Sequence, residues 1–172
     1  SSIDLAGINA VGSVVEARSA GNLRLRDSGA MTVNGPVVAG NNSVLRLETD
    51  GLLTIAAAGS VIAGDPVLAQ LGQVSLWGFG IALNGPVRAG DSVTLVAAGG
   101  AMSFATLPNT AIPGATISQA VAGAAIGARR LTTIAPETVE LNDNGNAIDA
   151  LAHRGLGGND VVVISNRPLL TI

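Results

Sequence analysis

Few residues in this sequence are of types that do chemistry, and the first group to consider lies around His153, the only histidine of the chain. Its neighbours in the sequence include three carboxylates and one arginine: Asp143, Asp149, Asp160 and Arg154. A histidine beside carboxylates could serve acid–base catalysis or bind a metal ion. A catalytic zinc site needs three suitable protein ligands, and the chain has neither a second histidine nor any cysteine. We therefore expect residues 142–160 to form a polar loop between two strands, without a catalytic residue.

Asp143-Asn144-Gly145-Asn146 is similar to the first half of a calcium-binding loop. An EF-hand loop would place a bidentate glutamate at its twelfth position, which Arg154 occupies here. The glycine-rich nonapeptide of RTX-type calcium-binding repeats is also missing, although Gly157-Gly158-Asn159-Asp160 has a faint likeness to it. No metal ion or other cofactor is predicted.

The aromatic side chains are the next candidates for a binding site. Trp77 and Phe79 alternate with Gly78 and Gly80, so the two rings are predicted to share one face of a strand. Pointing inward, they would fill a wide core. Pointing outward, they would form a small patch of the kind that marks a binding surface. The inward orientation is the one we expect.

Two Asn-Gly-Pro tripeptides mark equivalent corners of the chain. They are Asn34-Gly35-Pro36 and Asn84-Gly85-Pro86. Asparagine tolerates left-handed backbone angles, glycine permits positive φ, and proline fixes the exit of a turn. We therefore interpret all six residues as structural, with the asparagines hydrogen-bonding along the stack rather than binding a ligand.

Short strands with one buried face must position these residues. Leucine or valine alternates with other residues in Leu23–Leu25, Leu45–Leu47, Val74–Leu76 and Val93–Leu95, a pattern typical of half-buried strands. Each is followed by a glycine turn and further short strands, among them residues 31–33, 53–55, 81–83 and 102–104, in an order that repeats about every 20 to 28 residues. Periods of this length indicate a solenoid. We predict an all-β protein, a parallel β-helix of roughly eight coils that forms one domain over residues 1–172.

A longer repeat overlies the short one. Residues 3–33 match residues 139–172 with an offset of 136 to 139 residues, so the chain is predicted to hold slightly more than one unit of about 137 residues. The alanine-rich segment 118–131 contains two glycines that disfavour a helix, and we expect another coil there. Both ends follow the strand pattern without a polar cap. We therefore expect the natural polypeptide to continue in both directions, or copies to stack end to end.

Composition and charge exclude several classes of function. The chain is 48% hydrophobic but only 2% aromatic, which suits stacked aliphatic rows better than the ring-containing core of most globular enzymes. The formal net charge is −3, and Arg129-Arg130 is the only adjacent basic pair, so nucleic acid is not expected as a partner. The uncharged stretch between Asp91 and Arg129 is broken by Pro108 and Pro113, and it is not predicted to span a membrane.

The repeated stretches carry a family resemblance. Residues 5–12, 27–37 and 117–119 read LAGINAVG, DSGAMTVNGPV and ISQ. In them the chain resembles the filamentous-haemagglutinin-like exoproteins of Gram-negative bacteria, which leave the cell by two-partner secretion or as autotransporter-like passengers. The resemblance implies a right-handed parallel β-helix, secretion to the medium or the outer cell surface, and use as an adhesin or surface fibre. It supplies no catalytic residue.

Three classes of function remain open. The one we favour is a structural or adhesive rod segment of a large surface protein, whose partners are neighbouring repeats and a host-cell or bacterial surface receptor or glycan. The second is a fibre subunit whose copies stack head to tail. The third is a β-helical enzyme acting on polysaccharides, which would need clustered acid, base and metal ligands. The scattered carboxylates and the absence of Lys and Tyr argue against an enzyme.

Overall fold

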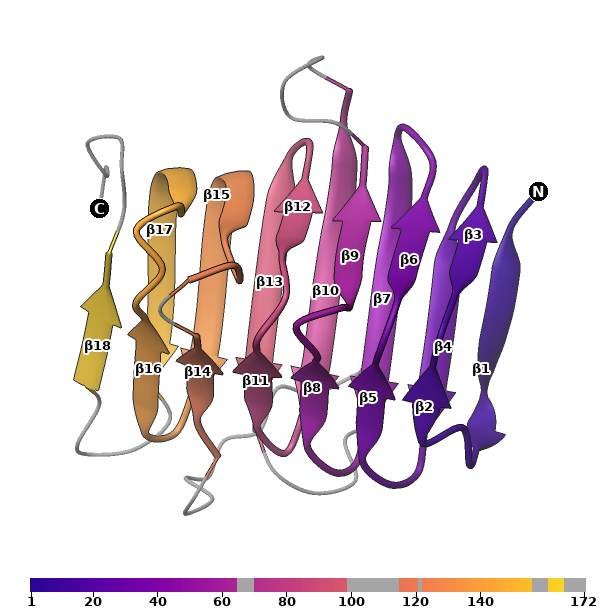
Figure 1. Cartoon of the computed structure of the whole chain (residues 1–172), viewed down its shortest axis with the longest axis horizontal. Helices are drawn as coiled ribbons and strands as arrows, with labels where there is room; N and C mark the ends of the chain where they lie inside the picture. The colour runs from indigo at the N-terminus through magenta and orange to yellow at the C-terminus, as the bar shows by residue number, and fades with distance from the viewer. Residues whose placement is uncertain (65–69, 99–114, 121, 156–160, 166–172) are drawn as a thin grey trace.

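A computed structural model shows how the short strands are assembled (Figure 1). It describes residues 1–64, 70–98, 115–120, 122–155 and 161–165. Within these ranges the chain forms strands and turns and no helix, so no described helix could cross a membrane. Successive coils of the chain lie side by side along the long axis of the molecule. The predicted all-β, solenoid-like class is confirmed.

Three faces follow one another along each coil. The first face carries the long strands β1 (Ile3–Asn9), β4 (Leu23–Asp27), β7 (Ser43–Thr49), β10 (Gly72–Gly78), β13 (Ser92–Ala97), β15 (Ile126–Ala135) and β17 (Ala147–Gly155). The second face carries β2 (Ser13–Val14), β5 (Met31–Val33), β8 (Leu53–Ile55), β11 (Ile81–Leu83), β14 (Ile117–Gln119), β16 (Thr138–Leu141) and β18 (Val161–Ile164). The third face carries β3 (Ala17–Ser19), β6 (Pro36–Ala39), β9 (Ser60–Ala63) and β12 (Val87–Ala89).

The strands of each face pair in parallel with those of the neighbouring coils. The first and third faces belong to one sheet because β15 turns the corner between them. Its Gly127 pairs with β12 of the third face, whereas its Leu131 pairs with β13 of the first. The sheet therefore nearly closes around the axis, which leaves few unpaired backbone groups along the sides of the stack.

The alternation of apolar and polar residues explains the interior. In β4, β5 and β8 the apolar residues are buried and the residues between them are partly exposed. In-register pairing stacks the buried residues into rows, one of which consists of Leu25, Leu47, Leu76 and Leu95. Burying a leucine side chain contributes roughly 1.5–3 kcal/mol. In the described part of the chain, rows of aliphatic side chains thus form a continuous core without aromatic rings.

The length of the coils varies more than the sequence predicts. Leu23 pairs with Leu45 and Val74 pairs with Val93, in the predicted manner. The next coil is much longer, because Val93 pairs with Leu131. It contains residues 99–114, so the strand predicted at 102–104 lies outside the described residues.

The longer repeat stays a prediction from the sequence. Its matched segments occupy different faces, since Ile3–Leu5 lie in β1 on the first face and Val139–Leu141 lie in β16 on the second. The alanine-rich segment 118–131 takes part in β14 and β15 and is not helical where it is described.

Candidate functional site

The segment around the histidine is a strand rather than a loop. Residues 147–155 form β17, so the prediction of a polar loop over residues 142–160 is wrong for that part. His153 pairs with Thr133, which continues the inward row after Leu95. The histidine Nδ1 lies 2.9 Å from Thr133 Oγ1, and its Nε2 is buried without a hydrogen-bond partner in the described part of the chain. His153 is therefore an inward-facing, partly buried side chain.

The described acidic residues near His153 in the sequence, Asp143 and Asp149, do not gather around it. Asp149 and Arg154 are exposed on β17, Asp143 lies before that strand, and Asp160 falls outside the described residues. Among the residues described, no three or more His, Cys, Asp or Glu side chains are placed to hold a metal ion. Within the described part of the chain, His153 is bonded to Thr133 and has no carboxylate partner.

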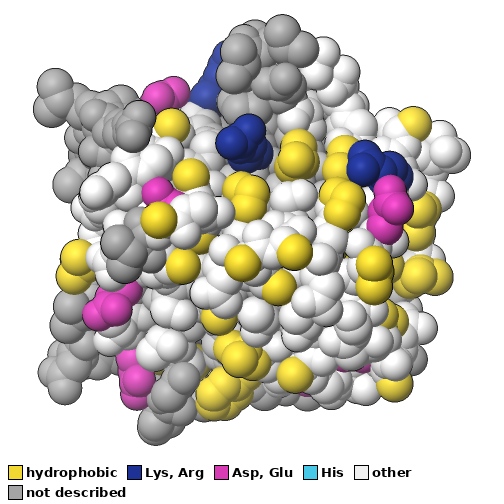
Figure 2. Space-filling view, in the orientation of Figure 1, with side chains coloured by type: hydrophobic (Ala, Val, Ile, Leu, Met, Phe, Trp, Pro, Cys, Tyr) yellow, Lys and Arg dark blue, Asp and Glu magenta, His cyan; other side chains and the backbone are white. Residues whose placement is uncertain are grey.

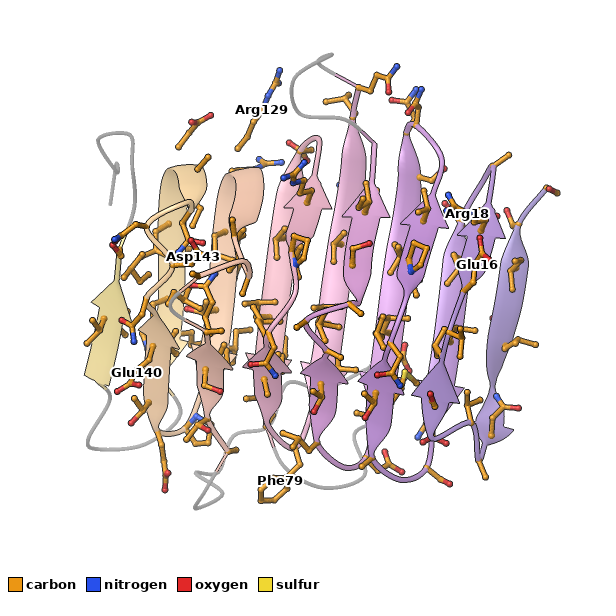
Figure 3. The ribbon with its side chains drawn as sticks, in the orientation of Figure 1. Glu16, Arg18, Phe79, Arg129, Glu140 and Asp143 are labelled. Atoms are coloured by element: carbon orange, nitrogen blue, oxygen red, sulfur yellow. The ribbon has the colours of Figure 1, made fainter. Side chains whose placement is uncertain are left out.

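The calcium-loop candidate is instead a buried corner of the core. Asp143 Oδ2 accepts a hydrogen bond from Ala124 N at 2.8 Å, and Asp143 Oδ1 accepts one from Gly145 N at 2.6 Å. Asn146 is fully buried, and its Oδ1 accepts a hydrogen bond from Ile126 N at 2.8 Å. Asp143 (labelled in Figure 3) and Asn146 thus accept hydrogen bonds from backbone amides, two of them in the preceding coil. Such partners are what buried polar side chains need.

Gln119 completes this polar corner. It follows Leu83 in an inward row of the second face, where the earlier coils carry Val33 and Ile55. Its Nε2 donates to Asn146 Oδ1 at 2.8 Å, and its Oε1 accepts from Asn146 Nδ2 at 3.0 Å. The two amides thus form a reciprocal pair inside an otherwise aliphatic stack. The sequence reasoning missed this pair, although a glutamine in phase with the Ile117 of a buried strand was a visible signal.

The Asn-Gly-Pro tripeptides lie where the second face meets the third. Gly35 and Gly85 do not have positive φ. Their need for glycine is steric, because a Cβ on Gly35 would lie 1.8 Å from Val15 O and one on Gly85 would lie 2.2 Å from Gly59 O. Pro36 begins β6, and the carbonyl of Pro86 accepts a hydrogen bond from Val61 N.

The two corner asparagines do not bond to each other. Asn34 donates through Nδ2 to Ser13 Oγ at 2.9 Å, one coil earlier. Ala56 occupies the corner between Asn34 and Asn84, since Ala56 N bonds to Val33 O and Asn84 N bonds to Ile55 O. The predicted hydrogen bonding along the stack is therefore limited to the Asn34–Ser13 contact, and both asparagines are exposed.

The inward orientation expected for the aromatic rings is wrong for Trp77. It follows the inward Leu76 in β10 and points outward from the first face, where it packs against Val96, Ala98 and Ile134. Phe79 lies beyond the end of β10, and its ring points away from the ribbon (Figure 3). The period-two pattern of Val74 and Leu76 already places Trp77 on the outer side.

Charged side chains surround Trp77 on the outer side of the first face. Glu48 pairs in register with Trp77 of the next coil and with Arg26 of the preceding one. Glu48 Oε1 lies 2.6 Å from Arg46 Nε and 3.2 Å from Arg24 Nε. The guanidinium carbon of Arg46 lies 5.3 Å from the centroid of the Trp77 ring, within the range of a cation–π contact. We call Arg24, Arg46, Glu48 and Trp77 the outer-face cluster.

Burial sets the electrostatics of this cluster. The side chain of Glu48 is 3% exposed, compared with 35% for Arg24 and 27% for Arg46. Burial raises the pKa of Glu48 above its usual value, and the hydrogen bond from Arg24 and the charges of Arg46, Arg24 and Arg26 offset part of that rise. Burial likewise lowers the pKa of Arg46, which the charge of Glu48 opposes. The cluster is tightly coupled, but it holds no second carboxylate to act with Glu48 as an acid–base pair.

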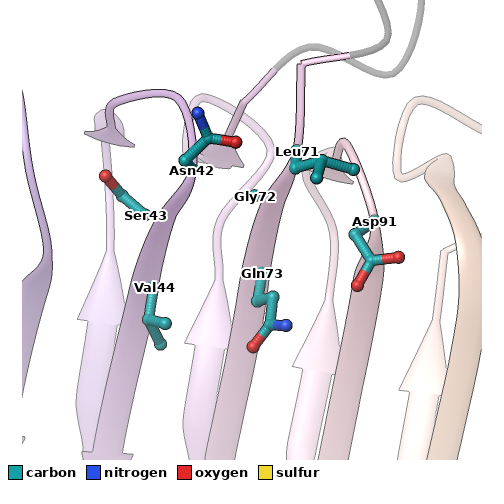
Figure 4. Close-up of a pocket in the computed structure, with 7 residues that line it drawn as sticks. All are labelled: Asn42, Ser43, Val44, Leu71, Gly72, Gln73 and Asp91. Carbon is teal, nitrogen blue, oxygen red and sulfur yellow. The ribbon is translucent and has the colours of Figure 1, made fainter.

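One depression lined by described residues, of about 250 Å³, lies near the corner between the third and first faces (Figure 4). Its lining residues are Asn42, Ser43, Val44, Leu71, Gly72, Gln73 and Asp91. The carboxylate of Asp91 is held by Arg130 Nη2 at 2.7 and 3.0 Å, so the charge in this depression is already paired.

The surface seen in Figure 2 carries few charged groups, and its apolar side chains are scattered in small spots. One charged pair on this side is Arg18 and Glu16, whose Nε and Oε1 lie 2.6 Å apart (Figure 3). Both side chains are more than half exposed, and exposed pairs of this kind contribute about 0–1 kcal/mol.

Comparison with known proteins identifies no relative of the chain. No protein-family model matches the chain, and neither a curated protein nor a solved structure matches it.

Proposed function

We propose that this chain is a segment of a structural or adhesive rod. In this proposal the solenoid is right-handed, consists of roughly eight coils, and belongs to a filamentous-haemagglutinin-like protein exported to the surface of a Gram-negative bacterium. The function of the segment is mechanical, because it holds binding surfaces for a receptor or glycan at a distance from the cell.

The observation that carries the proposal is the continuous parallel pairing of the coils on all three faces. Each described strand of the second face, from β2 to β18, pairs with the next one along the axis. Pulling along the axis would load many backbone hydrogen bonds and would separate aliphatic rows that water cannot easily enter. Such a stack supports load without needing a catalytic pocket, and its length grows by about 4.8 Å with each coil.

Two measurements on the chain test this proposal. Single-molecule pulling from residues 1 and 172 should give unfolding in steps of one or a few coils at high force, as expected for a nearest-neighbour stack. Beads coated with the chain should adhere to epithelial cells or to an array of surface glycans if the segment is adhesive, and the Leu76→Asp variant serves as the misfolded control. Unfolding at negligible force together with no adhesion would contradict both versions of the rod.

A self-assembling fibre subunit is the second candidate, because apolar side chains are exposed on or beside the strands at both ends of the described stack. At one end Leu5 is 49% and Val15 is 71% exposed, and at the other Val163 is 46% exposed. Head-to-tail copies would cover these residues and pair the edge strands.

Sedimentation over a range of concentrations tests assembly. The Val15→Lys variant should reduce any assembly, while Leu52→Lys should not, because Leu52 is 47% exposed but lies beside β8 in the middle of the stack. A chain that stays monomeric at every concentration would count against the fibre. The intact mass of the native polypeptide would then distinguish a long rod from a separate subunit of 16.9 kDa.

A further inference from the structure

Glu48 differs from the other buried carboxylates of the described residues. Asp27 and Asp143 are also nearly inaccessible, but they accept hydrogen bonds from backbone amides of a neighbouring coil. Glu48 is 2% exposed, its Oε1 faces two guanidinium groups, and its Oε2 is buried without a hydrogen-bond partner in the described structure. A buried carboxylate oxygen without a donor costs free energy in its charged form.

Two arginines on neighbouring strands lie beside Glu48. Arg24 and Arg46 are register partners on successive coils, so their backbones lie about 4.8 Å apart and their like charges are attached directly opposite each other. Like charges directly opposite each other destabilise a strand pair. The single negative charge of Glu48 lies beside both guanidinium groups and offsets one of the two positive charges, so its neutralisation would increase their mutual repulsion.

We propose that Arg24, Arg46 and Glu48 form an acid-sensitive latch on the outer side of the first face, which loosens when Glu48 Oε2 binds a proton. The proton comes from solvent and forms an O–H bond on the carboxylate, so the combined charge of the three groups rises from +1 to +2. Arg46 then shifts away from the neutral carboxyl group, and its contact with the Trp77 ring changes.

The surroundings of Glu48 fix the direction of the effect. From β4, Arg24 and Arg26 face it; from its own strand, Arg46 does; and β10 presents the uncharged Trp77. Asp50 lies just beyond β7, with its Oδ1 3.9 Å from Arg26 Nη2. Burial outweighs the arginine charges and raises the pKa of Glu48. The latch is therefore closed above this raised pKa, where Glu48 is charged, and loosens as the pH falls through it.

The latch lies outside the aliphatic core, because Glu48 and Trp77 alternate with the inward Leu47 and Leu76. Loosening it would change the charge and shape of the outer surface while the stacked rows remain intact. This inference goes beyond the rod function and does not depend on it, since a subunit of any function with this fold would respond in the same way.

Trp77 is the only tryptophan of the chain, so its fluorescence is a direct probe. We expect the emission of the wild-type protein to change in a single step as the pH falls, with a midpoint above the usual glutamate value of 4.5, while the far-ultraviolet circular dichroism stays constant. The Glu48→Gln variant should lack this step and should resemble the acid form at every pH. No step in the wild type, or a step retained in Glu48→Gln, would overturn the latch.

Matched variants exclude other titrating groups. Glu16→Gln removes an exposed ion-pair carboxylate, Asp50→Asn removes the nearest other carboxylate, and His153→Gln removes the histidine. All three should keep the fluorescence step, and its loss in any of them would assign the step to that group and contradict the proposal.

A second measurement, on the wild-type protein, tests the latch even if the Glu48→Gln variant does not fold. Selective carbon-13 labelling of the glutamate side-chain carboxyls gives one resonance for each of Glu16, Glu48, Glu137 and Glu140. One resonance should titrate above pH 4.5 with the same midpoint as the Trp77 emission. Coincidence of the two midpoints supports the latch, and the absence of such a resonance overturns it.

Discussion

Replacing Asn146 with alanine should cost much more stability than the same change at Asn34, although both asparagines lie near corners of the solenoid. Asn146 is fully buried, and its amide joins three other elements of the core. It accepts from Ile126 N at 2.8 Å, exchanges two hydrogen bonds with Gln119, and donates to Ser165 O at 2.9 Å. Asn34 is exposed and donates one side-chain bond, to Ser13 Oγ.

The size of the expected loss of stability depends on which groups lose a hydrogen-bond partner. Gln119 keeps its bonds to Ala124 O and Asp143 N, so its loss is close to the net value of about 1 kcal/mol per hydrogen bond. The buried Ile126 N–H loses its acceptor, which costs roughly 1–3 kcal/mol. With the bond to Ser165 O, we expect Asn146→Ala to lower the free energy of unfolding by about 3–5 kcal/mol. Asn34→Ala should lower it by less than about 1 kcal/mol.

Urea unfolding at 25 °C, followed by circular dichroism and by Trp77 emission, measures both values. The comparison of the two variants removes effects that any Asn→Ala change has on the unfolded chain. Equal losses of stability in the two variants, or a loss below about 1 kcal/mol for Asn146→Ala, would refute the reasoning that this buried amide pair holds two coils together.

Three further predictions concern the core, a corner and the latch. Leu76→Ala in the fully buried row should cost about 2–5 kcal/mol, whereas Leu52→Ala at a side chain that is 47% exposed should cost less than about 1 kcal/mol in the same urea titration. Gly35→Ala should lower the free energy of unfolding by about 1–3 kcal/mol or more, because its Cβ would lie 1.8 Å from a backbone oxygen. Gly7→Ala should be close to neutral, because nothing lies within 4 Å of its Cβ. Thermal unfolding compares the two variants. Because burial raises the pKa of Glu48 on folding, protonation relieves the cost of the buried charge and stabilises the fold as a whole, even though it loosens the latch. The unfolding free energy of the wild type relative to Glu48→Gln should therefore increase as the pH falls from 7, and a constant difference would contradict this.

Much of the fold follows from short-range pattern. The strands Met31–Val33, Leu53–Ile55 and Ile81–Leu83 are found where the alternation predicts them. Alternation with a period of two residues indicates which side chains share a face of a strand. The signal is clearest where aliphatic and charged residues alternate, as in Leu23–Asp27.

Features that depend on the stacking of coils could not be predicted in this way. The pairing of Val93 with Leu131 depends on where the chain returns after a long connection, which local pattern does not report. Gly35 looks like a positive-φ turn residue, but the neighbouring coil, far away in sequence, is what excludes a side chain there. Likewise, the partners of Asn146 come from Gln119 and Ile126, one coil earlier.

The most direct test of the parallel, in-register stack is a pair of distances along the second face. Thr32 is linked through successive register partners to Thr54, Ala82, Ser118 and Glu140. The chain has no cysteine, so spin labels can be placed at two introduced cysteines without interference. At about 4.8 Å per coil, labels at 32 and 118 should be about 14 Å apart, and labels at 32 and 140 should be about 19 Å apart. Narrow distributions that differ by about one coil spacing are the predicted result. Broad distributions, or a second distance equal to or shorter than the first, would contradict the stacked solenoid.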